Sequence, residues 1–82
     1  MKRALTFQEE ATYAELKKLA GEGRSVTGRQ LRDAGFAKKV VEIYGADVAY
    51  PESLQSRKLQ ILRDKKWINM ERHNGGTYTL LP

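Results

Sequence analysis

Apolar residues recur at steps of three and four positions along much of the chain, the spacing of one face of an α-helix. The first such stretch lies between Thr6 and Gly21. Thr6 and Glu9 form a capping-box pattern at its start, and Gly21 is a typical helix stop. Its apolar positions are Phe7, Ala11, Ala14, Leu16, Leu19 and Ala20. This pattern predicts a first helix.

Two shorter helical stretches follow. Thr27 and Gln30 repeat the capping box, and Gly35 supplies the stop, so a second helix is expected between them. Residues 36–44 keep a roughly helical apolar spacing and predict a further short helix, although three β-branched residues disfavour it. A brief extended stretch at residues 25–26 and a loop at residues 45–50 complete this part of the chain.

A last helix is predicted to begin at Pro51 and to reach Lys65. Proline suits the first helical position, and the next residue, Glu52, suits the positive end of the helix dipole. One face is apolar, with Leu54, Leu59, Ile61 and Leu62. At about 100° per residue, the opposite face carries Ser53, Ser56, Gln60 and Arg63, flanked by Arg57 and Asp64.

The chain closes with two predicted strands, at residues 67–71 and 77–81, joined by a glycine-containing turn. Alternation places Ile68 and Met70 on the core side together with Tyr78 and Leu80. A series of helices followed by one terminal hairpin is the order of elements in a winged helix-turn-helix. We therefore expect an α+β fold, a winged helix-turn-helix with three or four helices and a C-terminal two-stranded β-hairpin wing. One domain is expected to span residues 1–82.

Composition limits what else the chain can be. Eighty-two residues are near the lower limit for a core that holds a domain together alone, and 40% of them are hydrophobic. The chain has no cysteine and a single histidine, so we expect neither disulfide nor metal, and no cofactor. It has no apolar run near the ~20 residues of a membrane span, and its first five residues are too short and polar to be expected to form a signal peptide. These features predict a cytoplasmic protein, or a module cut from a larger one.

The residue types that form catalytic sites are not grouped along the sequence. The one histidine, His73, lies in the glycine-bounded turn rather than beside a nucleophile. The glycine pair Gly75-Gly76 leads into a strand, whereas phosphate loops lead into a helix. The carboxylates are scattered among basic residues. We therefore expect a non-catalytic domain.

The charge favours a polyanionic partner. Fifteen Lys and Arg residues against ten Asp and Glu give a net charge of +5, which suits double-stranded DNA, although a merely soluble basic surface has the same balance. Arginine and glutamine pair with guanine and adenine in the major groove, whereas wing residues and helix starts contact phosphates. Three regions supply candidates: the last helix with Ser53, Ser56, Arg57, Gln60 and Arg63, the hairpin tip with Arg72, His73 and Asn74, and the second helix start with Thr27, Gly28 and Arg29.

Each candidate region has a plainer interpretation. The last helix can present an ordinary solvated face, and the residues of the hairpin tip can be there only because they favour a turn. Thr27 can act only as a helix cap. Trp67 and Tyr78 can stack on a base, but packing of the hairpin onto the helices is the more usual role of such aromatic side chains.

The end of the chain resembles a known family. The run Leu59–Lys65, followed by Ile68 and by Gly76-Thr77-Tyr78, resembles the C-terminal winged-helix domain of DpnI-type methyl-directed restriction endonucleases. The resemblance implies recognition of GATC-like sites carrying N6-methyladenine, by a module that accompanies a nuclease domain, in a prokaryotic nucleoid. The residues that it nominates for DNA binding are Gln60, Arg63, Asp64, Lys65 and Tyr78.

Two alternatives stay open at this point. One is a free-standing winged-helix transcription regulator, for which the first helix is a candidate dimerisation element. The other is a winged helix used for protein–protein contact, which predicts an exposed apolar patch and weak salt dependence.

Overall fold

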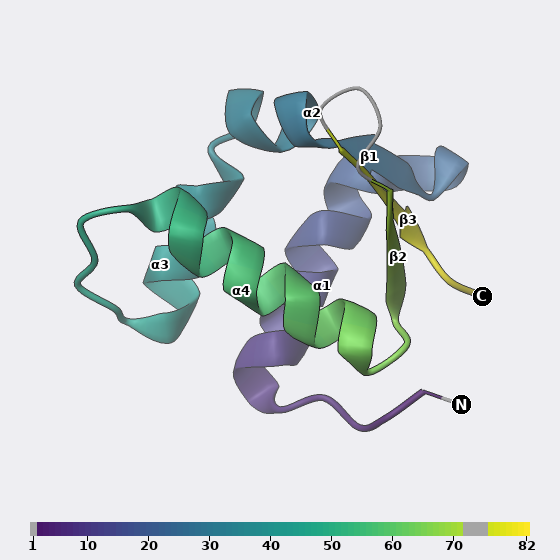
Figure 1. Ribbon diagram of the computed structural model, residues 1–82, viewed down its shortest axis with the longest axis horizontal. Helices are drawn as coiled ribbons and strands as arrows, with labels where there is room; N and C mark the ends of the chain where they lie inside the picture. The colour runs from purple at the N-terminus through teal and green to yellow at the C-terminus, as the bar shows by residue number, and fades with distance from the viewer. Residues whose placement is uncertain (1, 72–75) are drawn as a thin grey trace.

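The computed structural model describes residues 2–71 and 76–82, in which helices form most of the first part of the chain and a pair of strands closes it (Figure 1). Within this part of the chain the protein has an α+β fold with four α-helices and a three-stranded antiparallel sheet. The elements in chain order are α1 (Phe7–Ala20), a short 3-10 helix (Gly21–Gly23), β1 (Ser25–Thr27), α2 (Gly28–Asp33), α3 (Phe36–Tyr44), α4 (Pro51–Asp64), β2 (Ile68–Glu71) and β3 (Thr77–Leu80).

Both predicted capping boxes are present. The Thr6 hydroxyl accepts from the Glu9 N–H, and the Glu9 carboxylate accepts from the Thr6 N–H at 2.9 Å. Thr27 and Gln30 repeat this exchange at the start of α2, with bonds of 3.1 and 2.8 Å. Each box satisfies N–H groups that have no partner inside the first helical turn. The predicted starts of α1 and α2 are therefore confirmed.

The predicted apolar side of α1 differs from the buried side. Phe7 is 85% exposed and Ala14 is exposed, whereas Thr12 and Leu16 are completely buried. Glu9 is buried as well as Thr12 and Leu16. It lies two residues after Phe7, and thus about 200° from Phe7 around the helix. The buried side of α1 therefore faces away from Phe7, although Phe7 fits the apolar spacing of this helix.

The sheet contains one strand more than the predicted hairpin. β3 lies in the middle, with β2 on one side and β1 on the other, and both pairings are antiparallel. Val26 pairs with Tyr78 and is almost completely buried. Burial of this side chain fixes the three-residue stretch beside β3, so the prediction of a two-stranded sheet was incomplete.

The register of the hairpin agrees with the predicted alternation. Ile68 lies opposite Leu80, and both side chains are buried. Met70 lies opposite Tyr78, and both are half-buried and pack against the core. The predicted inward face of the hairpin is therefore confirmed.

Helix α4 is held by its apolar face. Leu59 and Leu62 are completely buried and Leu54 is nearly so, in a core that also contains Phe36 and Val40 of α3. Figure 1 shows α4 crossing in front of α1, with α3 beside its first half. This packing fixes which side of α4 remains outside. None of the helices in the described ranges is long and apolar enough to cross a membrane.

The end of α4 is a Schellman motif, in which two N–H groups beyond the helix bond back to its last turn. The Trp67 N–H donates to the Leu62 carbonyl and the Lys66 N–H to the Arg63 carbonyl, both at 3.0 Å. Lys66 has φ 70°, in the left-handed region that favours glycine. The motif turns the chain sharply from α4 into β2.

Trp67 packs against the amino-terminal part of the chain. Its ring meets Tyr13 of α1 edge to face, with 5.2 Å between the ring centroids. Its indole N–H donates to the Arg3 carbonyl at 2.6 Å. These contacts agree with the interpretation of Trp67 as a packing residue that joins the hairpin to the helices.

Candidate nucleic-acid interface

The outer face of α4 is a row of exposed polar side chains. Ser53, Ser56, Arg57 and Gln60 are all exposed, opposite the buried leucines of the same helix. None of these four side chains forms a hydrogen bond or an ion pair with another residue in the described ranges. The face predicted from the sequence is thus available to a partner.

Arg63 lies at the edge of this face and is 40% exposed. Its guanidinium donates to the Asp64 carboxylate at 3.2 and 3.3 Å. An exposed ion pair of this kind contributes little to stability, typically about 0.2–1 kcal/mol. The guanidinium is therefore free to exchange Asp64 for a stronger acceptor.

Lys65 is engaged inside the protein. Its ammonium contacts the Glu9 carboxylate at 2.5 Å, with only 23% of the Lys65 side chain and 11% of the Glu9 side chain exposed. This ion pair joins the end of α4 to the start of α1. The hydrogen bond from Lys65 lowers the pKa of Glu9, and the bond from the Thr6 N–H acts in the same direction, against the effect of burial.

We expect the Glu9→Gln variant to unfold about 1–2 kcal/mol more easily, because it keeps the capping bond but loses the ion pair. The pKa of Glu9 is below its ordinary value of 4.5 in the folded protein. Its contribution is therefore complete above pH 4.5 and disappears as the pH falls through the lowered value. Thermal unfolding followed by circular dichroism between pH 7 and pH 3 measures this.

The exposed Glu10, one position along the same helix, supplies the matched control as Glu10→Gln. The control should keep the wild-type loss of stability in acid, whereas Glu9→Gln should show a smaller loss. Identical acid profiles for wild type and Glu9→Gln would contradict this role of the ion pair.

Another lysine of α4 faces α3. The Lys58 ammonium lies over the ring of Tyr44, 4.4 Å from its centroid. The Tyr44 hydroxyl is buried and has no hydrogen-bond partner among the residues that the structure describes, and burial raises the pKa of this phenol. Lys58 therefore belongs to helix packing rather than to the outer face of α4.

At the start of α2, two of the three candidate DNA-binding residues already form hydrogen bonds within the protein. The Thr27 hydroxyl accepts from Gln30, and the Gly28 N–H donates to the Gly76 carbonyl at 3.1 Å. Arg29 is exposed and makes no side-chain bond to another described residue. Of this group, Arg29 is thus the one with an available charged side chain.

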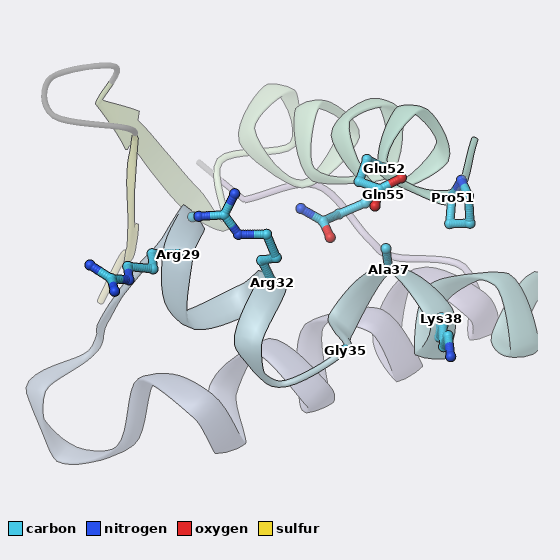
Figure 2. A pocket seen from close by; sticks show the side chains of 9 residues that line it. Arg29, Arg32, Gly35, Ala37, Lys38, Pro51, Glu52 and Gln55 are labelled. Atoms are coloured by element: carbon cyan, nitrogen blue, oxygen red, sulfur yellow. The ribbon is translucent and has the colours of Figure 1, made fainter.

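A hollow of about 610 Å³ lies between α2, the start of α3 and the first turns of α4. We call it the N-end hollow, and its polar lining is Arg29, Arg32, Lys38, Glu52 and Gln55. Figure 2 shows Arg32 and Gln55 directed toward the space between α2 and α4, while Lys38 points away from it. Arg32 and Gln55 are not among the predicted site residues. The i, i+3 spacing of Arg29 and Arg32, which puts both on one side of a helix, is a signal that points to the first of them.

A second hollow, of about 500 Å³, lies at the other end of α4. We call it the C-end hollow, and its charged and polar lining is Arg3, Arg63, Asp64, Lys66 and Asn69. It brings residues from the two ends of the chain to the same place. Arg3 and Lys66 are also absent from the predicted set. Folding brings Arg3 to the end of α4, whereas Lys66 follows this helix directly in the sequence.

The remaining predicted residues are Tyr78 and those of the hairpin tip expected from the sequence. Tyr78 is half-buried in the central strand, between Val26 and Met70, and packs against the core. Arg72, His73 and Asn74 lie outside the described residues. The residues that the structure brings together at the surface are therefore those of α4 and α2.

Comparison of the chain with protein-family models, with curated proteins and with solved structures finds no match. Over residues 2–71 and 76–82, no three histidine, aspartate or glutamate side chains are grouped closely enough to hold a metal ion.

Proposed function

We propose that this chain is a winged-helix domain that binds double-stranded DNA, with α4 entering the major groove. The observation that carries the proposal is the exposed face of α4. It presents Ser53, Ser56, Arg57 and Gln60 to solvent without side-chain partners among the described residues, and arginines flank it at both ends of the helix. The major groove of B-DNA is about 12 Å wide and admits one α-helix.

The order of the elements supports the same proposal. A helix is followed by a short strand, then by further helices and a closing hairpin, and the short strand pairs with the last strand of the hairpin. In a winged helix, the helix directly before the hairpin is the one that reads DNA, and here that helix is α4. The hairpin is then the wing, with Arg72, His73 and Asn74 as its candidate DNA contacts.

The side chains on α4 suit reading of bases. A guanidinium such as that of Arg63 binds both acceptors of guanine, and a carboxamide such as that of Gln60 binds adenine in two places. Each such pair discriminates by about 1–3 kcal/mol against the wrong base. The serines between them are short enough to let the helix backbone approach the base edges.

Recognition of N6-methyladenine in GATC-like sites is the sharper form of the proposal, and it rests on the resemblance at Leu59–Lys65. Within that run, Leu59 and Leu62 are core residues, so they carry packing. Lys65 is held by Glu9. Gln60 and Arg63 are thus the members that fit DNA recognition, as part of a reader module whose nuclease activity belongs to another domain.

Titration of the protein into labelled duplexes at one fixed salt concentration tests the proposal. The duplexes carry GATC unmethylated, hemimethylated and fully N6-methylated, with a scrambled methylated control. We expect the fully methylated GATC duplex to bind at least about tenfold more tightly than the unmethylated one, which corresponds to about 1.4 kcal/mol.

The other outcomes also decide between functions. Equal and salt-sensitive binding to all four duplexes would retain a DNA-binding domain and reject the methyl preference. Absence of binding to every duplex would reject DNA binding.

One observation favours a second candidate function, protein–protein contact. Phe7 on α1 is 85% exposed and Tyr50 before α4 is 74% exposed, although large aromatic side chains are usually packed. A protein partner bound at Phe7 would be lost in a Phe7→Ser variant, whereas DNA binding through α4 should be unchanged. This comparison separates the two functions.

A further inference from the structure

We propose that Tyr50 extends the DNA-contacting face of α4 and packs its ring against a methyl group on a base edge in the major groove. This inference rests on the proposed DNA binding and adds a residue outside the predicted set. Two base-edge groups have this chemistry. They are the 5-methyl group of thymine and an N6-methyl group on adenine, because both positions face the major groove.

Tyr50 is the residue from which α4 begins. It holds the N-cap position, and its carbonyl accepts from the Ser53 N–H at 3.0 Å. Tyr50 and Ser53 are therefore neighbours across the first helical turn, and Ser53 belongs to the exposed face of α4. In helix-turn-helix proteins the N-terminal residues of the reading helix contact base edges. Tyr50 thus lies at the end of α4 where base contacts are expected.

The side chain of Tyr50 is available to a partner. The residue is 74% exposed, and its hydroxyl forms no hydrogen bond with another side chain or backbone group in the described ranges. Aromatic rings carry a large apolar area, which is usually packed in the folded protein. Contact between this ring and an apolar group of a ligand removes both surfaces from water, and this favours binding.

The remainder of the exposed face of α4 is polar. The exposed residues of this helix are Glu52, Ser53, Ser56, Arg57, Gln60 and Asp64. Such side chains pair with the donors and acceptors of bases, whereas a methyl group needs apolar contact. Within residues 2–71 and 76–82 the other large apolar side chain that is exposed is Phe7. It lies on the side of α1 opposite Glu9, and Glu9 is the residue that contacts the end of α4. Apolar contact beside the reading face therefore falls to Tyr50.

Pro51 restricts the backbone at Tyr50. A proline disfavours helical geometry in the residue before it, and Tyr50 has φ −127° and ψ 87°. With the backbone restricted, placing the ring orders only two side-chain torsions. The entropy lost when the ring binds is therefore small, which favours a net gain from the contact.

The test compares the wild type with Tyr50→Ala, Tyr50→Phe and Phe7→Ala, the matched control at the other exposed aromatic residue. Affinities are measured at one fixed salt concentration for four duplexes. These carry GATC with and without N6-methyl groups, each with thymine or deoxyuridine in the site. Removal of the contacted methyl group should weaken wild-type binding about fourfold, the loss expected for one buried methyl group. The same removal should have no effect on Tyr50→Ala, whereas Tyr50→Phe and Phe7→Ala should keep the fourfold loss.

The methyl group whose removal no longer affects Tyr50→Ala is the one that the ring contacts, either that of thymine or that of methyladenine. Unchanged methyl sensitivity in Tyr50→Ala, or a wild type that binds all four duplexes equally, would overturn the role of Tyr50 and leave DNA binding intact. Loss of sensitivity in Tyr50→Phe would overturn it too, because the hydroxyl would then be the contact. A wild type that binds no duplex would instead refute the proposed function, and this inference with it. Tyr50 is exposed, so Tyr50→Ala should keep the wild-type thermal midpoint, and lost binding is then not lost folding.

Discussion

Raising the salt concentration from 50 to 200 mM should weaken DNA binding by about 10²-fold, because each phosphate contact releases bound counterions. Four cationic side chains are proposed phosphate contacts, which corresponds to a slope near −4 for log affinity against log salt. They are Arg29, Arg32 and Arg57, together with Arg72. Fluorescence anisotropy with one labelled duplex, repeated over this salt range, measures the slope.

The size of this slope separates the proposed interface from a generally basic surface. The net charge of +5 belongs to the whole chain, yet Lys65 is already paired with Glu9, and Lys18 and Lys39 both contact Glu15. A slope near zero, with the protein still bound to the duplex, would contradict a surface built on phosphate contacts.

Replacement of Arg63 by alanine should weaken binding to the preferred duplex by about 10- to 100-fold, or about 1–3 kcal/mol, and should relax base preference. Arg63 lies at the edge of the outer face of α4, held only by an exposed bond to Asp64. Loss of this internal pair costs little stability, so the effect should be confined to binding. Affinities for the preferred duplex and a random duplex, measured side by side, give both quantities.

Arg72→Ala is the contrasting variant. Loss of an arginine that contacts phosphates, the role proposed for Arg72, should weaken binding to every sequence alike and lower the salt slope by about one unit. Equal losses on specific and random duplexes for both Arg63→Ala and Arg72→Ala would refute this division between base reading and phosphate binding.

Local signals in the sequence predicted the helices well. Capping boxes at Thr6 and Thr27 depend on residues three positions apart, and both form as expected. The start of α4 at Pro51 likewise follows from the preference of proline for the first position of a helix. Its buried face follows from a repeat within one helix, which is why the exposed residues of α4 were predicted correctly.

Features that depend on distant parts of the chain were not predictable in the same way. β1 has three residues, and its partner strand lies some fifty positions later, so no local pattern indicates the pairing. The resemblance nominated Lys65 for DNA, yet its partner Glu9 lies 56 positions away along the chain. Arg3 lies at the end of α4 only because the amino terminus packs there, with the Arg3 N–H bonded to the Lys65 carbonyl.

Phe7 shows a limit of apolar spacing as a signal. It fits the repeat of α1, but the buried side of that helix is set by Thr12 and Leu16, and it includes the charged Glu9. A carboxylate is buried there because Lys65 and the Thr6 N–H bind it. A pattern of apolar residues alone cannot show which side of a helix such a polar pair will occupy.

Mapping the bound surface by amide chemical shifts tests the central claim most directly. A ¹⁵N-labelled protein would be titrated with a fully methylated GATC duplex at low salt. We predict that the largest shifts occur along the outer face of α4, from Ser53 to Arg63, and around Arg29 and Arg32, while the outer side of α1 near Phe7 stays unchanged. Shifts confined to the surface around Phe7, or no shifts at a large excess of duplex, would contradict DNA recognition by α4.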